Sequence, residues 1–98
     1  MPPTNPLPHQ GRRAEHRLSL LDTIAAASRR EPGNLAYRVH QGAEDPRTIV
    51  LYEEYGREAD FTAHCASAHF QEIVLGKVVP LLDSRDVLRC VPRPQVRA

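Results

Sequence analysis

The chain has 98 residues, of which 41% are apolar and 26% charged, and its formal net charge is +1 at pH 7. These values are ordinary for one globular domain, which at this length can bury only a modest core. Charges of both signs are scattered along the chain, so we expect neither a nucleic-acid interface nor a membrane-binding patch. No apolar stretch approaches the ~20 residues of a membrane span, and the N-terminus lacks the apolar core of a secretory signal. A cytoplasmic protein is therefore predicted.

Residues 1–12 are rich in proline and are predicted to form a disordered or extended arm. From Arg13 onward a helix is expected, and the turn Glu31-Pro32-Gly33 should end it, because proline cannot extend the hydrogen-bond ladder. Apolar and small residues recur there at steps of three and four, which is typical of one face of an amphipathic helix. They are Ala14, Leu18, Leu21, Ile24, Ala25 and Ser28.

Two strands are expected next, because side chains of alternating character follow the first helix. The first strand covers residues 35–40 and the second covers 49–55, with the loop GAEDP between them. A short connection of this kind predicts an antiparallel hairpin. In the second strand, Glu53 and Tyr55 should share one face with Ile49 and Leu51.

The last third of the chain predicts two helices and a strand. A short helix is expected over about 57–66, and Ser67 could cap a further helix that Gly76 and Pro80 weaken towards its end. Alternation over 87–91 predicts a final strand, and residues 93–98 form a tail. Cys65 and Cys90 lie in separate elements with no CxxC motif, so both are expected to be free thiols.

The expected element order is α-β-β-α-α-β. One further strand at the front would make it β-α-β-β-α-β, the ferredoxin-like split βαβ fold of the α+β class. Residues 1–12 have no strand character, so the usual first strand is missing or replaced, and the folded domain should span residues 13–92.

Several short motifs, in this order and spacing, resemble the antibiotic biosynthesis monooxygenase (ABM) domain family. The pattern is E-P-G, a strand with Tyr and Val, a D-P loop, a strand ending E-x-aromatic, and a helical His followed five residues later by His-Phe. In this chain the matching residues are Glu31-Pro32-Gly33, Tyr37, Val39, Asp45-Pro46, Glu53, Tyr55, His64 and His69-Phe70.

The resemblance implies a ferredoxin-like dimeric α+β barrel, that is, a homodimer that pairs through its sheets. It also implies an activity among those of the family, which include cofactor-free monooxygenases acting on quinols or phenols. Relatives of the family include a sugar-phosphate isomerase and haem-degrading enzymes, so the reaction follows only loosely from the fold. Family members normally begin with a strand in the middle of the sheet, where this chain has MPPTNPLPHQ.

Glu53 and His64 are the candidate catalytic residues. A carboxylate beside apolar side chains can act as an acid or base, and the imidazole of His64, three residues after Phe61, should point inward and could take a proton from a phenol. The alternatives are that Glu53 binds a backbone group or an arginine, and that His64 is a core histidine bonded to the backbone or to Glu53.

Tyr55, His69 and Tyr37 are the candidate substrate-binding residues. Tyr55 could line a slot for a planar substrate, whereas cross-strand packing is the alternative for Tyr37. His69 stands five residues after His64, a spacing that does not suit a metal site on one helix unless a break at Ser67 brings the two together. With no third ligand evident in the sequence, no metal site is predicted.

No glycine-rich phosphate loop occurs, so no cofactor is expected. The leading hypothesis is a cofactor-independent monooxygenase that abstracts a proton from a small aromatic or enolisable substrate. Two alternatives stay open: a proton-shifting isomerase of a small carbonyl compound, and a non-catalytic dimeric ligand-binding module.

Overall fold

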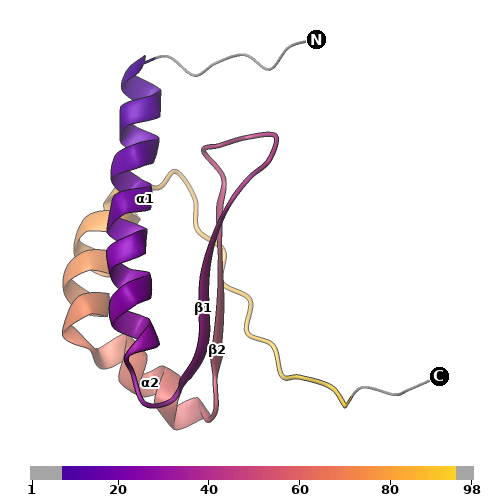
Figure 1. The fold of residues 1–98 in the computed structure, drawn as a ribbon. Coiled ribbons are helices and arrows are strands. Elements are labelled where there is room, and N and C mark those ends of the chain that lie inside the picture. Colours follow the sequence, from indigo (N-terminus) through magenta and orange to yellow (C-terminus); the bar gives the residue numbers. More distant parts are fainter. Residues whose placement is uncertain (1–7, 95–98) are drawn as a thin grey trace.

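A computed structural model describes residues 8–94 of the chain (Figure 1). It contains two α-helices, two strands, a helix of π type and a final 3₁₀ turn. In chain order these are α1 (Pro8–Arg29), β1 (Asn34–Gln41), β2 (Ile49–Tyr55), α2 (Glu58–Ala66), η1 (Phe70–Val78) and η2 (Val79–Leu81). Among these described elements, none of the helices has the length and apolar character needed to cross a membrane.

Helix α1 buries the face that the sequence predicts. Leu21, Ile24 and Ala25 are at most 2% exposed, and Ser28 is fully buried beside them. The helix begins at Pro8 rather than Arg13, so the predicted arm is wrong for residues 8–12, while its first seven residues lie outside the described part. Proline suits the first turn of a helix because its missing N–H would have no partner there.

The two strands form the predicted antiparallel hairpin. Tyr37 lies opposite Glu53 and Val39 opposite Leu51, with one irregularity near Ala36. At the far end, the Gly42 N–H donates a 2.8 Å hydrogen bond to the Thr48 carbonyl and closes the loop. This register places Tyr37 and Val39 on the same face as the inward residues of β2.

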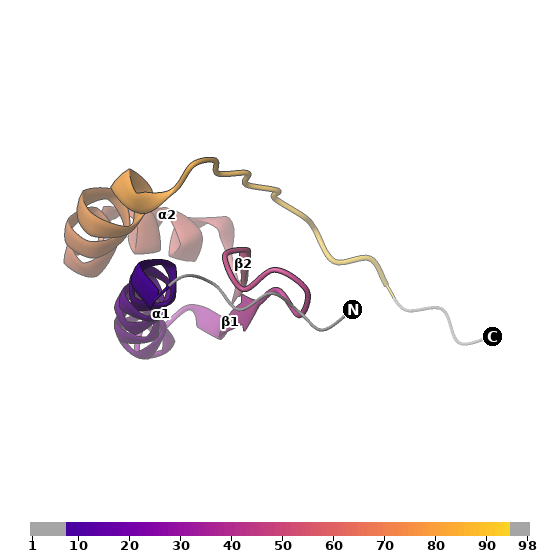
Figure 2. The same cartoon turned by 90° about the horizontal axis from the view of Figure 1, so that it is seen from above.

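The helices cover one face of the hairpin. Helix α1 and helix η1 run side by side in both views, and the hairpin lies to one side of them (Figures 1 and 2). The opposite face is open, with Val50 56% and Tyr52 49% exposed. Between the helices and the hairpin lies a core of Ile24, Ala25, Tyr37 and Val74, with Val39, Leu51, Phe70, Ile73 and Val79 packed against it.

Ser67 separates α2 from η1. Its backbone is extended, with φ −66° and ψ 153°, which stops α2. Its hydroxyl donates to the His64 carbonyl at 2.6 Å and accepts a hydrogen bond from the Phe70 N–H at 3.2 Å. The prediction of a second helix capped by Ser67 is therefore confirmed in substance, although this helix has π geometry and gives way to a 3₁₀ turn near Pro80.

The predicted last strand is wrong, because residues 83–94 have no regular secondary structure and extend away from the helices (Figure 2). Leu88 and Val91 are each 87% exposed. The segment is attached through Arg89, which pairs with Glu58 at 3.3 Å and lies over the Phe61 ring. A strand needs a neighbour to satisfy its backbone groups, and within residues 8–94 the sheet consists of β1 and β2, with no further strand beside this segment.

The molecule is thus a small α+β protein. Its order α1-β1-β2-α2 is the central part of the ferredoxin-like order β-α-β-β-α-β. Within residues 8–94, the positions of the first and last strands of that order are not filled by strands.

Candidate functional site

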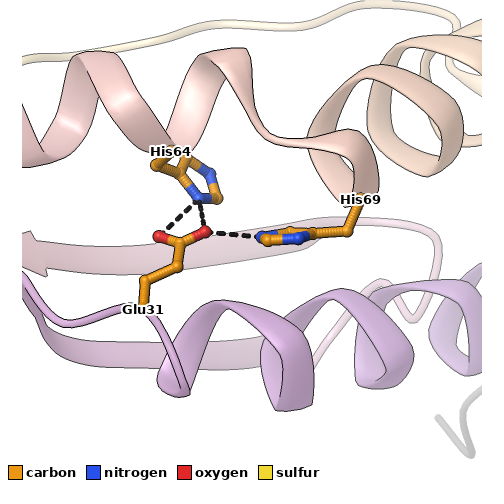
Figure 3. Close-up of side chains that lie close together, drawn as sticks. All are labelled: Glu31, His64 and His69. Atoms are coloured by element: carbon orange, nitrogen blue, oxygen red, sulfur yellow. Dashed lines mark hydrogen bonds and ion pairs between the residues drawn. The ribbon is translucent and has the colours of Figure 1, made fainter.

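Four segments of the chain bring acidic and imidazole side chains together between the hairpin and the helices. The turn after α1 contributes Glu31, strand β2 contributes Glu53, helix α2 contributes His64, and the residue before η1 is His69. Figure 3 shows the carboxylate of Glu31 contacting both histidine rings.

His64 is the centre of this cluster and is 2% exposed. Its Nδ1 lies 2.9 and 3.1 Å from the two carboxylate oxygens of Glu31. Its Nε2 lies 3.3 Å from Oε1 of Glu53. A neutral imidazole carries only one N–H donor, so a carboxylate at each ring nitrogen fits a ring that receives a proton or another cation.

His69 joins the cluster through Glu31. Its Nε2 lies 2.5 Å from Oε2 of Glu31, and 22% of its side chain is exposed. The five-residue spacing from His64 would place the rings apart on one continuous helix, but the break at Ser67 turns His69 back towards the same carboxylate.

Glu53 holds the opposite side of the His64 ring. Its Oε1 also accepts a 3.0 Å hydrogen bond from the Tyr55 hydroxyl. Of the alternatives left open by the sequence, the structure therefore places Glu53 against His64 and Tyr55. Among the ion pairs of the described residues, those of Glu31 and Glu53 are made with histidines.

Aromatic rings surround His64. The ring centroids of Tyr55 and Phe70 each lie 5.2 Å away, and those of Tyr37 and Phe61 lie 6.0 and 6.2 Å away. This low-polarity surrounding strengthens the electrostatic interaction between the imidazole and the two carboxylates.

The two tyrosines near the cluster are held as neutral phenols. Burial raises the pKa of Tyr37 well above its usual value, and the charges of Glu53 and Glu31 raise it further. Burial is also the main reason that the pKa of Tyr55 is raised, followed by the charge of Glu53 and the hydrogen bond to it. Tyr37 is 2% exposed, so of the predicted substrate-binding residues it is the least accessible.

Cys65, next to His64 in the sequence, does not have the surroundings of a nucleophile. Burial and the charge of Glu53 raise the pKa of its thiol, whereas catalytic cysteines have a lowered pKa. Both Cys65 and Cys90 are free, as the sequence predicts.

Glu31 was missed as a site residue by the sequence reasoning, which assigned it only to the turn that ends the first helix. A signal was present, however. A carboxylate just after the C-terminus of a helix is disfavoured by the helix dipole, so such a residue needs a positive or proton-donating partner elsewhere.

Glu31, His64 and His69 are also the described residues that could hold a metal ion. One ligand atom from each lies within 4.8 Å of the others. The spacing of the histidines and the lack of a third ligand in the sequence disfavoured a metal site, but the break at Ser67 brings His69 towards His64 and Glu31 adds a third candidate ligand.

A surface depression of about 320 Å³ lies beside β1, and His64 is not among its lining residues. Its lining includes Tyr37 but none of the other predicted site residues. The lining residues are Arg29, Asn34, Leu35, Ala36, Tyr37 and Arg38.

The known proteins that are similar to this chain point to one family. The sequence pattern of the antibiotic biosynthesis monooxygenase family matches residues 8–74. The solved structure of a "putative antibiotic biosynthesis monooxygenase" from Nitrosomonas europaea is 36% identical over 60% of this chain and 62% of that one, with a TM-score of 0.58. A comparison with curated proteins gives no match.

Two further solved structures share the fold over a larger part of the chain. Rv0793 from Mycobacterium tuberculosis is 26% identical, with a TM-score of 0.68 over 84% of this chain and 86% of its own. A conserved protein from Methanosarcina mazei Go1 is 25% identical, with a TM-score of 0.70 over 76% of this chain and 73% of its own. With the family pattern matched over residues 8–74 and this ferredoxin-like arrangement, the chain belongs to the antibiotic biosynthesis monooxygenase family.

Proposed function

We propose that this protein is a monooxygenase that acts on a quinol or another small phenol without a cofactor. The observation that carries the proposal is the position of His64, which is enclosed by aromatic rings and flanked by Glu31 and Glu53. Membership of the monooxygenase family supports the same reaction class. His64 acts as the proton acceptor, and Glu53 orients its ring.

The proposed reaction needs no external reductant. His64 takes the phenolic proton, and the electron-rich phenolate reacts with O₂ at a ring carbon. A C–O bond forms, the O–O bond breaks, and the product keeps one oxygen atom while the other leaves as water. The substrate supplies all four electrons, so that a quinol and O₂ give a hydroxyquinone and water. A site protected from water limits side reactions of the intermediate.

We further propose that the protein works as a homodimer formed through the open face of the hairpin. Val50 and Tyr52 are about half exposed there, and a domain of this size gains appreciably from covering such a surface.

Oxygen consumption with a panel of quinols tests the monooxygenase proposal. His64→Ala should lower kcat/KM by ~100-fold or more, which is the usual contribution of a positioned general base. Glu53→Gln should lower it less, because the base remains. Glu44→Gln is the matched control, since this carboxylate is exposed in the loop of the hairpin, and His16→Ala on the exposed side of α1 is the control for His64→Ala.

Unchanged oxygen uptake in folded His64→Ala would contradict the proposed role of the histidine. Turnover of a carbonyl substrate under strict anaerobiosis would instead identify a proton-shifting isomerase.

A non-catalytic ligand-binding module is the second candidate, and one observation favours it. Both ring nitrogens of His64 face carboxylates and the ring is almost fully buried, while the 320 Å³ depression is lined by other residues. If the protein binds a phenol without forming a product, and His64→Ala binds it equally well, the result would support a ligand-binding module and not an enzyme.

A further inference from the structure

We propose that Glu31, His64 and His69 form a binding site for a divalent first-row transition metal ion such as Zn²⁺. The ligand atoms are the carboxylate of Glu31, Nδ1 of His64 and Nε2 of His69. This inference rests on the geometry of the cluster and is an alternative to the general-base role proposed for His64, because a metal ion on Nδ1 and a hydrogen on Nε2 leave the ring no free nitrogen to accept a proton.

The separations between the donor atoms suit a shared ion. Two ligands that each lie ~2.1 Å from one metal are ~3.0 to 3.4 Å apart in octahedral or tetrahedral geometry. Glu31 Oε2 lies 2.9 Å from Nδ1 of His64 and 2.5 Å from Nε2 of His69. Of these two contacts, the one to His69 must lengthen, by about half an ångström on this estimate, and His69 can move because its side chain is partly exposed.

The three donors come from separate parts of the fold. His64 lies within α2, His69 directly precedes η1, and Glu31 lies in the four-residue turn between α1 and β1 (Figure 3). The turn is itself fixed, since the Glu31 N–H bonds the Ser28 carbonyl and the Asn34 N–H bonds the Glu31 carbonyl. The ligands are therefore largely positioned before an ion arrives.

A second carboxylate orients the buried histidine in the way that metal sites require. Metal-bound histidines usually donate their other N–H to a carboxylate, which fixes the tautomer and raises the basicity of the ligand nitrogen. Here Nε2 of His64 faces Glu53, which also accepts the Tyr55 hydroxyl hydrogen bond. With its hydrogen on Nε2, His64 turns the lone pair of Nδ1 towards Glu31.

The two carboxylates of the cluster also favour binding of a cation. Glu31 and Glu53 are both largely shielded, with 17% and 25% of their side chains exposed. In the described part of the chain, their ion-pair partners are histidines, not lysine or arginine. A lone pair on Nδ1 facing a carboxylate is repulsive unless a proton or a metal ion lies between them, so the two compete for one position.

The donor set selects the kind of ion. Two imidazoles and one carboxylate suit zinc, iron and related ions, whereas Mg²⁺ and Ca²⁺ prefer oxygen ligands. Three protein ligands leave at least one coordination position for water or another small ligand.

Metal binding is measured on tag-free protein stripped with a chelator. Titration with Zn²⁺ by calorimetry should give one ion per chain, and Co²⁺ should give the visible absorption of a nitrogen-ligated site. Glu31→Gln and His69→Ala should each weaken the affinity by about 100-fold or more, because each removes one of only three ligands. Glu53→Gln should weaken it by ~10- to 100-fold through the lost support of His64.

His40→Ala is the matched control, because this histidine is exposed on β1 outside the cluster, and it should bind as the wild type does. His69→Ala is preferred to a His64 variant, since His69 is partly exposed and its loss should leave the fold intact by circular dichroism. Absence of binding up to about 1 mM Zn²⁺ would overturn the proposal. So would affinities of Glu31→Gln and His69→Ala equal to that of His40→Ala, or Mg²⁺ binding as tight as that of Zn²⁺.

Discussion

The hydroxyl of Ser28 is fully buried in α1, and its Oγ has no hydrogen-bond partner among the described residues. Such a group loses its water on folding and gains nothing in return, at a cost of ~1–3 kcal/mol. Ser28→Ala should therefore raise the free energy of unfolding by about 1 kcal/mol, and Tm by ~4–8 °C for a domain of this size.

Ser67→Ala is the matched comparison, because the Ser67 hydroxyl makes two hydrogen bonds at the break between α2 and η1. This variant should lose about 1 kcal/mol, as is typical when a capping hydroxyl is removed. Thermal unfolding followed by circular dichroism measures both changes, and equal changes in the two variants would contradict the role given to each hydroxyl.

At the scale of single residues, the sequence predicted part of the cluster and missed its connecting member. His64 and Glu53 were found because each lies on an inward face that the periodicity of its own element reveals. Glu31 is 33 residues from His64 and 38 from His69 along the chain, and a pattern within one element carries no information about such a contact. Only tertiary packing brings Glu31 to both rings.

At the scale of elements, the entry into β1 depends on Gly33. A Cβ at this position would overlap the side chain of Asp60 in the first turn of α2, and the Gly33 carbonyl accepts a 3.0 Å hydrogen bond from the Gly56 N–H. Gly33→Ala should therefore push α2 away from the turn and lower the free energy of unfolding by ~1–3 kcal/mol, the usual cost of overpacking.

Gly76→Ala provides the control in η1, where the nearest atom to a new Cβ is 3.5 Å away. The added methyl group fits, and the loss of backbone freedom in the unfolded chain should stabilise the protein by about 0.5–1 kcal/mol. Urea unfolding compares the two variants, and a Gly33→Ala protein as stable as the wild type would refute the close contact.

Elements that a pattern within one short segment reveals were predicted correctly. Elements that need a partner distant in the sequence were not. The buried stripe of α1 and the alternation of the two strands are properties of short segments, so they could be read directly. Residues 87–91 alternate just as well, yet Val87 and Leu88 are exposed and form no strand. Alternation shows that a segment could join a sheet, but not whether a neighbour is available.

At the scale of the whole molecule, the proposed dimer would cover the open face of the hairpin. Val50→Lys should weaken the dimer by ~100-fold or more, because a two-fold axis would bring two like charges together at the interface. Ala26→Lys adds the same charge to the exposed side of α1 and should leave the dimer intact. Light scattering coupled to size exclusion measures the mass, and a Val50→Lys protein that stays dimeric would place the interface elsewhere.

The loop that joins β1 to β2 lies at the opposite end of the hairpin from α2 (Figure 1). It is closed by its own contacts, including the Gly42–Thr48 hydrogen bond and the Asp45–Arg47 ion pair at 3.2 Å, while Ala43 and Glu44 are exposed. Nothing in the Glu31–His64–His69 cluster depends on the length of this loop. The peptide bond between Ala43 and Glu44 is therefore a suitable insertion point for a fluorescent label or an affinity tag, from which the cluster could be observed without being disturbed.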